Sequence, residues 1–400
     1  MLSGPDSSER SSATPISPAQ ITSLDHEQER SPENSIVAKP DTPSTLELTC
    51  LFTLIFLLFA CIMAILKGYP SSVDNFGDSS AYMSLAAAIR RWEFSGIVIK
   101  QFWGLPYGMA ALSKIAGISD RTSLLIFSIM PSLLAVLMAR RLWNGWIAGY
   151  FAVLNFDWLQ RSFLGGSEPL FVCLLLASFW AIRRQRWLLA ALLASLATVV
   201  RPMGLFALVG VGLTLLWGRQ FRHFAAATMT GLAVGALYVF PIAKNFGNPV
   251  ANVSSYHSSQ WAGGWLFGFP FYAIVKGTLL YPAPWTNLIL SFGWIALVLV
   301  GVIGMIRSRE FRDYCRSHMV EALFLVPYLW CLFTYNYPSW ARSNFARFAI
   351  PILPFVLLAL YRWLPKDRRL LWGVGVLSSV LAAISAIGVA NVLQMLKNMF

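Results

Sequence analysis

Charged residues are scarce in this sequence of 400 residues, where Asp, Glu, Lys and Arg together make up 12%. A soluble globular domain carries about 25% charged residues. Hydrophobic residues make up 57% of the chain. Apolar runs of about 20 residues, the length of a membrane-spanning helix, recur along it. The composition therefore excludes an ordinary soluble domain and indicates a polytopic membrane domain.

The sequence also lacks the patterns of a disulfide framework or a metal centre. Its five cysteines show no Cys-x-x-Cys spacing, and four of them fall in or beside apolar runs. We interpret them as small buried side chains that do not identify a redox compartment. His257 has no partner at metal-ligand spacing, so it does not indicate zinc. We expect no metal and no cofactor.

The net charge of +13 is unevenly distributed. Residues 1–47 hold eight of the 18 acidic residues but three of the 31 basic residues. The other basic residues cluster between apolar runs, as expected for loops on the cytoplasmic side of a membrane. Since aromatic and basic residues also populate membrane interfaces, the positive charge does not indicate a nucleic-acid partner.

Residues 1–47 are rich in Ser, Pro, Thr and Glu and have almost no aromatic residues. Such a segment cannot bury enough apolar surface to offset the entropy lost on ordering. It also lacks the basic start and short apolar core of a signal peptide. We expect a disordered cytoplasmic tail over 1–47 and one transmembrane domain over 48–400.

The domain over 48–400 is expected to be all-α, with about ten or eleven transmembrane helices. The expected spans cover residues 48–66, 122–139, 145–156, 168–182, 187–200, 203–217, 224–243, 286–306, 319–335, 348–362 and 371–395. In the first outer loop we expect an amphipathic surface helix over 83–92 and a re-entrant or interfacial helix over 102–117. With the N-terminus inside, every dense basic cluster falls on the inner side.

The candidate functional residues are the polar residues that we expect near the outer ends of the spans. Charge at membrane depth costs roughly 2.5–3.5 kcal/mol at the helix centre on insertion scales, so it usually has a role. Asp74, Asp78 and Tyr82 stand four apart, the spacing of one helical face. Asp78 also fits an N-cap, and the two interpretations are compatible. Lys100 adds a cation to the same loop.

Two further candidates lie where spans begin or break. Glu168 opens a span just before Pro169, which also fits an ordinary helix-start signal. Arg201 precedes Pro202 between two apolar half-runs, which indicates a broken helix lining a cavity. A guanidinium there can bind phosphate in a bidentate manner, and a snorkelling arginine is the alternative.

Arg342 and Arg347 stand at the outer end of a late span, against the positive-inside trend. An anionic ligand would explain that exception. His257 lies in a long outer loop beside Tyr256 and Trp261. Aromatic and hydroxyl residues of this kind line sugar sites, and they also populate membrane-interface belts.

These segments together resemble the GT-C superfamily of integral-membrane glycosyltransferases, in particular its mannosyltransferase-like members. The resemblance runs from about residue 46 to 365. The matching segments are the acidic loop 74–82, Leu105-Pro106-Tyr107-Gly108, Ser167-Glu168-Pro169-Leu170-Phe171, the stretch 196–204, and Arg347-Phe348 followed by Pro351 and Pro354. Two features depart from the family pattern, since the acids of the loop stand four apart and Gly108 replaces a proline.

The resemblance implies a hexosyltransferase that moves a sugar, with inversion, from a polyprenyl-phosphate donor to a glycan, lipid or protein acceptor on the outer face. Asp78, or else Asp74, would be the base, and Arg201 and Arg347 would stabilise the phosphate, with Arg342 and Lys100 behind them. Glu168 would orient an arginine or bind the acceptor. A bacterial inner membrane is expected, or the endoplasmic reticulum in a eukaryote.

Two other classes of protein remain open. A transporter or lipid flippase also has many spans, a broken helix and buried ions, and predicts matched broken segments in both halves of the chain. No such repeat is evident, since residues 220–400 have no counterpart of the acidic loop. A non-catalytic membrane scaffold would leave the outward Asp, Glu and Arg sets unexplained.

Overall fold

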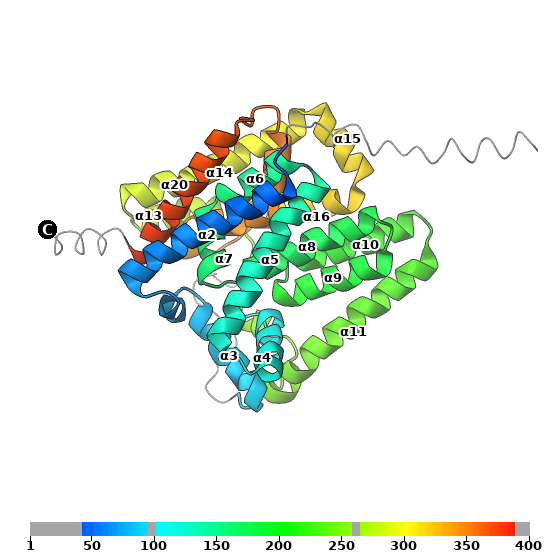
Figure 1. Ribbon diagram of the computed structural model, residues 1–400. Coiled ribbons are helices and arrows are strands. Elements are labelled where there is room, and N and C mark those ends of the chain that lie inside the picture. Colours follow the sequence, from blue (N-terminus) through cyan, green and yellow to red (C-terminus); the bar gives the residue numbers. More distant parts are fainter. Residues whose placement is uncertain (1–41, 95–100, 258–264, 389–400) are drawn as a thin grey trace, which may run out of the picture. The chain divides into compact units, whose positions relative to one another are not determined.

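The computed structural model describes residues 42–94, 101–257 and 265–388, which are mostly helical (Figure 1). In chain order the helices are α2 (Thr45–Lys67), η2 (Ser71–Asn75), α3 (Ser79–Arg91), α4 (Gly104–Ala116), α5 (Asp120–Leu142), α6 (Gly145–Val153), α7 (Phe156–Leu164), α8 (Glu168–Arg183), α9 (Trp187–Val200), α10 (Gly204–Trp217), α11 (Phe221–Phe246), α12 (Ala251–His257), α13 (Tyr272–Leu280), α14 (Trp285–Arg307), α15 (Arg309–Ser317), α16 (Met319–Thr334), α17 (Pro338–Ala341), α18 (Phe345–Ala349), η3 (Ile350–Ile352), α19 (Leu353–Ala359) and α20 (Arg368–Ile387). The all-α prediction is confirmed. The tail expected over 1–47 lies outside the described residues as far as residue 41, and α2 begins three residues before the predicted domain start.

Several helices are suited to a membrane. Five of those described, α2, α5, α11, α14 and α20, are long and apolar enough to cross one, or up to seven spans if each of two bent helix pairs counts as one. The bent pairs are α7 with α8 and α15 with α16, and shorter apolar helices lie at Trp187–Val200, Gly204–Trp217 and Phe345–Ala359. The expected ten or eleven crossings are therefore reached only if these short helices cross as well.

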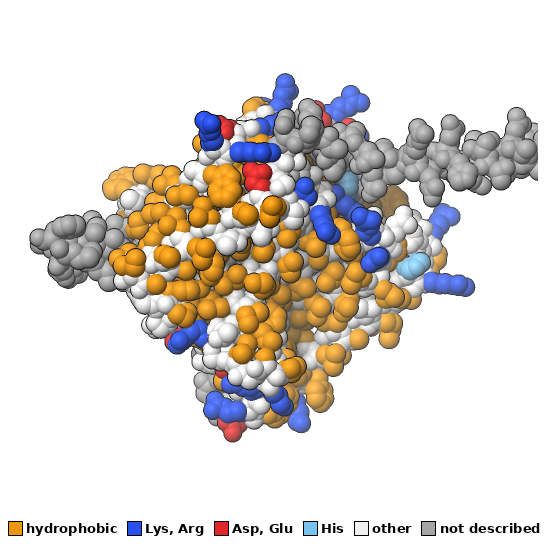
Figure 2. Space-filling model, viewed as in Figure 1, with side chains coloured by type: hydrophobic (Ala, Val, Ile, Leu, Met, Phe, Trp, Pro, Cys, Tyr) orange, Lys and Arg blue, Asp and Glu red, His pale blue; other side chains and the backbone are white. Residues whose placement is uncertain are grey.

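Hydrophobic side chains form a broad band on the face shown in Figure 2, with Lys and Arg gathered at two opposite borders. One border includes the first residues of α2. Arg140 Nε donates to Pro43 O at 3.1 Å, Tyr150 Oη donates to Pro365 O at 3.0 Å, and Arg368 lies 3.6 Å from a Glu47 carboxylate oxygen. These contacts bring the basic end of α5 and the basic start of α20 beside the start of α2.

Polar residues start several of these helices. The side chains of Ser119, Asn155 and Asp367 each accept a hydrogen bond from a main-chain N–H in the first turn of α5, α7 and α20. Such caps satisfy donors that have no partner inside the helix. These short polar signals therefore separate the apolar runs into distinct helices.

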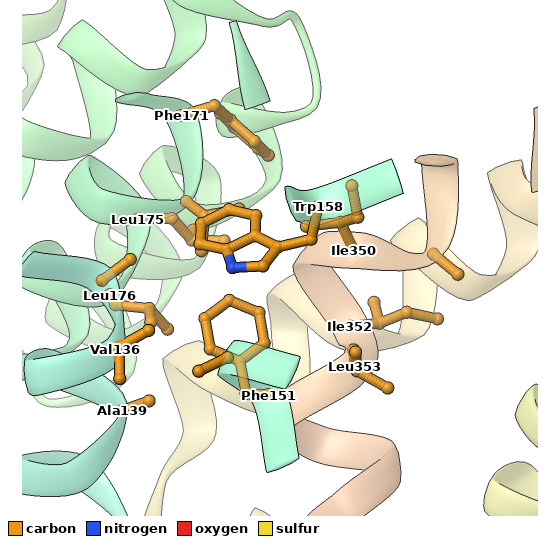
Figure 3. Packing of buried hydrophobic residues seen from close by; sticks show 14 of the residues in the cluster. Val136, Ala139, Phe151, Trp158, Phe171, Leu175, Leu176, Ile350, Ile352 and Leu353 are labelled. Carbon is orange, nitrogen blue, oxygen red and sulfur yellow. The ribbon is translucent and has the colours of Figure 1, made fainter. Parts of the chain in front are cut away.

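The core beneath the candidate site is aromatic and aliphatic (Figure 3). Trp158 of α7 packs against Phe151 of α6, with ring centroids 4.8 Å apart. Residues from α5, α8, η3 and α19 surround the pair, among them Val136, Ala139, Phe171, Leu175, Leu176, Ile350, Ile352 and Leu353. The packing fixes α7 against α8 and the late helices, which carry the polar residues described next.

Helix α8 carries a charged residue at each end, an acidic one at its start and a basic one at its last residue. It packs against α5 on one side and α9 on the other (Figure 1). It begins at Glu168 and ends at Arg183, and the chain bends by 105° between α7 and α8. Gly165 has a φ of +100° in this bend, where a Cβ would also meet Leu124 at 2.7 Å. A glycine is therefore needed to bring Glu168 back toward α7.

Candidate functional site

A buried carboxylate holds two arginines at the start of α8. Glu168 has no exposed side-chain surface, and its Oε1 accepts hydrogen bonds from Arg201 Nη2 and Arg347 Nε. Arg201 lies in the break between α9 and α10, and Arg347 lies on α18. We refer to Asp78, Tyr82, Ser167, Glu168, Arg201 and Arg347 as the Glu168 cluster. It joins four segments that the sequence analysis predicts to lie on one side of the membrane.

The break at Arg201 has a local cause. Pro202 lacks the N–H that would continue α9, and Arg201 itself has extended backbone angles. A Cβ on Gly204 would meet the Thr198 main-chain nitrogen at 2.4 Å, so only glycine allows the chain to turn this tightly. The predicted helix break is confirmed, and it aims the Arg201 guanidinium at Glu168.

Asp78 is the accessible acid of the cluster. Its Oδ2 accepts from Arg347 Nη2 at 2.8 Å, while 35% of its side chain stays exposed. Asp78 occupies the N-cap position of α3, yet its side chain makes no capping hydrogen bond. The carboxylate is therefore turned toward Arg347 rather than toward the helix that follows it.

Tyr82 and Ser167 extend the cluster. Tyr82 Oη donates to Ser167 Oγ at 3.1 Å, and Arg201 Nε donates to the same oxygen at 3.1 Å. Burial raises the pKa of Tyr82 to about 12, and the negative charges of Asp78 and Glu168 act in the same direction. Tyr82 therefore remains a neutral hydrogen-bond donor at physiological pH.

Asp74 lies in a different environment, so the expectation of one helical face is wrong for it. Asp74 belongs to η2 and forms a bidentate pair with Arg121 of α5, with Nε to Oδ1 at 2.8 Å. Gly77, with a φ of +49°, separates η2 from α3. The four-residue spacing therefore does not place Asp74 beside Asp78 on one helix.

Three other predicted site residues are not placed in the cluster. Lys100 lies outside the described residues. His257 is the last residue of α12, and its side chain lies outside the described part of the chain. Arg342 is 6% exposed, and its Nη2 donates to Tyr281 O at 3.1 Å.

Sequence reasoning missed one residue of this region, Arg161 on α7. It is 8% exposed, and its guanidinium lies 4.8 Å from the centroid of the Phe76 ring. Asp157 stands one turn earlier on the same helix, within electrostatic range of Arg161, Arg347 and Glu168. An arginine four residues after an aspartate inside a nine-residue helix is the signal that could have identified it.

The site is built from carboxylates, arginines and hydroxyls. Among the described residues, no three His, Cys, Asp or Glu side chains lie close enough to hold a metal ion. A surface hollow of about 780 Å³ lies beyond the other end of α8, and it includes no residue of the cluster. Its lining residues are Gln185, Trp187, Arg219, Gln220, Phe221, Arg222 and His223.

No protein-family model and no curated protein matches this chain. The crystal structure of the Archaeoglobus fulgidus oligosaccharyltransferase in the apo form is similar to it, with a TM-score of 0.43 and 14% sequence identity. The match covers 85% of this chain and 54% of the other, so this chain spans about half the length of that protein. A likeness of this degree carries no weight for the function.

Proposed function

We propose that this protein is an inverting glycosyltransferase of the membrane. It moves a sugar from a polyprenyl-phosphate donor to a glycan, lipid or protein acceptor on the outer face. The observation that carries the proposal is the pairing of an accessible carboxylate, Asp78, with an arginine that a buried glutamate holds in place. A bacterial inner membrane, or the endoplasmic reticulum in a eukaryote, is the proposed location.

Asp78 is the proposed general base. Its Oδ2 is held by Arg347, and Oδ1 makes no hydrogen bond among the described residues. In the reaction the acceptor oxygen attacks the anomeric carbon, and its proton passes to Asp78. The bond from that carbon to the phosphate oxygen breaks, and the electron pair leaves with the phosphate. Attack opposite the leaving group inverts the anomeric centre.

Arg201 and Arg347 are the proposed cations for the leaving phosphate. A guanidinium fixed before the reaction stabilises negative charge as it develops, without a further cost of reorganisation. Glu168 provides that fixation, since it accepts from both arginines while fully buried. Tyr82 and Ser167 add a neutral support, because the tyrosine positions the serine hydroxyl that Arg201 contacts.

The test compares Asp78→Asn with Asp74→Asn in purified protein supplied with radiolabelled polyprenyl-phosphate sugar and membrane acceptors. Loss of a general base lowers a rate by about 10²–10⁴-fold, and Asp78→Asn is expected to fall in this range. Asp74→Asn is the matched control, since its pair with Arg121 lies outside the cluster, and it should stay within a few-fold of wild type. Undiminished transfer by Asp78→Asn would refute the mechanism. Movement of labelled lipid without any sugar transfer would favour the flippase class instead.

A further inference from the structure

Arg161 differs from the other two arginines of this region in having no carboxylate partner within ion-pair distance among the described residues. Its side chain is more than nine-tenths buried, and its Nε and Nη1 are buried without a hydrogen-bond acceptor. Arg201 and Arg347 both donate to Glu168. Arg161 makes no ion pair within 4.0 Å among the described residues, although Asp157 precedes it by one helical turn. Buried cations are normally paired, so an unpaired one indicates a missing anion.

The surroundings of Arg161 direct its guanidinium toward the acidic loop. The aliphatic part of the side chain packs beside Gly166, where a Cβ would meet the Arg161 Cβ and Cδ at 2.9 Å. The guanidinium lies over the Phe76 ring and against Gly77, where a Cβ would meet Nη1 at 2.6 Å. The absence of a side chain at position 77 therefore leaves this cation next to the main chain that leads into Asp78.

That main chain offers further donors for an anion. The N–H groups of Gly77 and Asp78 donate no hydrogen bond among the described residues. They immediately precede α3, a helix of 13 residues whose dipole favours negative charge at its start. A buried guanidinium, two unbonded amides and a helix N-terminus all favour one type of ligand, a compact oxyanion.

We propose that Arg161 and the Gly77–Asp78 main chain bind the phosphate of the lipid-linked donor directly. Arg201 and Arg347, already held by Glu168, act on it from fixed positions. This assignment rests on the proposed function and identifies where the donor phosphate sits. It also places the anomeric carbon near Asp78, since the main chain that binds the phosphate leads directly into that base.

The test measures binding and needs no sugar transfer. Purified protein in detergent is titrated with undecaprenyl monophosphate, with undecaprenol, which lacks the phosphate, and with inorganic phosphate. Melting temperature and dissociation constant are followed for wild type, Arg161→Gln, Arg161→Lys and the control Arg90→Gln, whose arginine pairs with Asp120 and contacts no residue of the Glu168 cluster. Wild type and Arg90→Gln should bind the lipid phosphate at least 10-fold more tightly than the alcohol. Arg161→Gln should lose that preference, and Arg161→Lys should keep part of it.

The ligand-free proteins separate binding from folding. If Arg161 serves a ligand, Arg161→Gln should melt at or above the wild-type temperature, because the change removes an unpaired buried charge. A much lower melting temperature in both Arg161 variants would make the residue structural and overturn the inference, as would an unchanged lipid preference in Arg161→Gln. Equal affinity for inorganic and lipid phosphate would overturn the lipid assignment. Arg161-dependent binding without sugar transfer in wild type would refute the transferase and leave this phosphate site in place.

Discussion

The two ends of α8 carry buried arginine–glutamate clusters of similar composition and different completeness. At its last residue, Arg183 Nε donates to Glu321 Oε1 at 2.9 Å and Nη2 donates to Oε2 at 3.1 Å. Tyr314 Oη donates to Glu321 and accepts from Trp143 Nε1 at 2.7 Å. Both oxygens of Glu321 and all three nitrogens of Arg183 have partners, the third nitrogen bonding to a main-chain carbonyl.

At the first residue of α8 the set is incomplete. Glu168 Oε2 is buried without a hydrogen bond, and so are two nitrogens of Arg161. Buried polar groups in proteins are nearly always satisfied, and exceptions call for an explanation such as a catalytic role. We refer to Arg183, Tyr314 and Glu321, with the groups of Leu142 and Trp143 that they contact, as the closed cluster. It joins α5, α8, α15 and α16 and is complete without a ligand. We refer to the Glu168 cluster together with Arg161 as the open cluster. It retains donors and acceptors that a substrate can use.

The largest effect should come from breaking the closed cluster. Glu321→Gln leaves Arg183 buried without its countercharge, which should lower the free energy of unfolding by about 3–5 kcal/mol. Chemical unfolding in detergent measures it, and transfer per folded molecule should stay near wild type. The double variant Arg183→Met with Glu321→Leu should recover most of the loss, because an apolar pair needs no partner. A Glu321→Gln protein as stable as wild type would remove the distinction between the two clusters.

The same change at the open cluster should act mainly on the reaction. Glu168→Gln frees Arg201 and Arg347 from their fixed positions, and transfer should fall about 100-fold, or ~2.7 kcal/mol of transition-state stabilisation. Initial rates per folded molecule, normalised by size-exclusion recovery, measure this. Glu321→Gln is the matched control. A similar rate loss in both variants would show that the effect is general destabilisation.

The smallest effect concerns the tyrosine of the open cluster. The pKa of Tyr82 in the folded protein is about 12, above the ordinary 10.0, so the unfolded chain releases this proton first as pH rises. Its contribution to stability is complete below pH 10 and should be lost between about pH 10 and 12. Tyr82→Phe should cost about 1 kcal/mol at pH 8, from the lost hydrogen bond to Ser167. The measurement is the melting temperature at pH 8 and at about pH 11. The drop in melting temperature between these two pH values should be smaller for Tyr82→Phe than for wild type.

Much of the arrangement could be predicted from the rarity of charge in an apolar chain. Glu168, Arg201 and Arg347 each stand out for that reason, and alternation of the spans placed them on one side. Whether they carry the chemistry stays a prediction. Asp74 was misplaced because a helical spacing argument does not register that Gly77 turns the chain between η2 and α3.

Other features depended on contacts that the sequence does not display. Arg183 belongs to one of the basic stretches between the apolar runs. Its partner Glu321 stands 138 residues further along the chain, and only folding brings the two side chains together. Arg161 was missed for the opposite reason. Its importance lies in having no carboxylate partner among the described residues, which requires the positions of its neighbours to be known.

The length of α8 has a consequence for the two charged clusters at its ends. Its 16 residues rise about 24 Å, and any tilt makes its extent along the membrane normal smaller still. The hydrocarbon core of a bilayer is about 30 Å thick, so the two charged clusters lie closer together than the two lipid headgroup layers. Most of α8 is buried between α5 and α9, so protein rather than lipid surrounds these charges. The packing of neighbouring helices therefore lets one short helix hold two charged clusters at a separation smaller than the thickness of the hydrocarbon core.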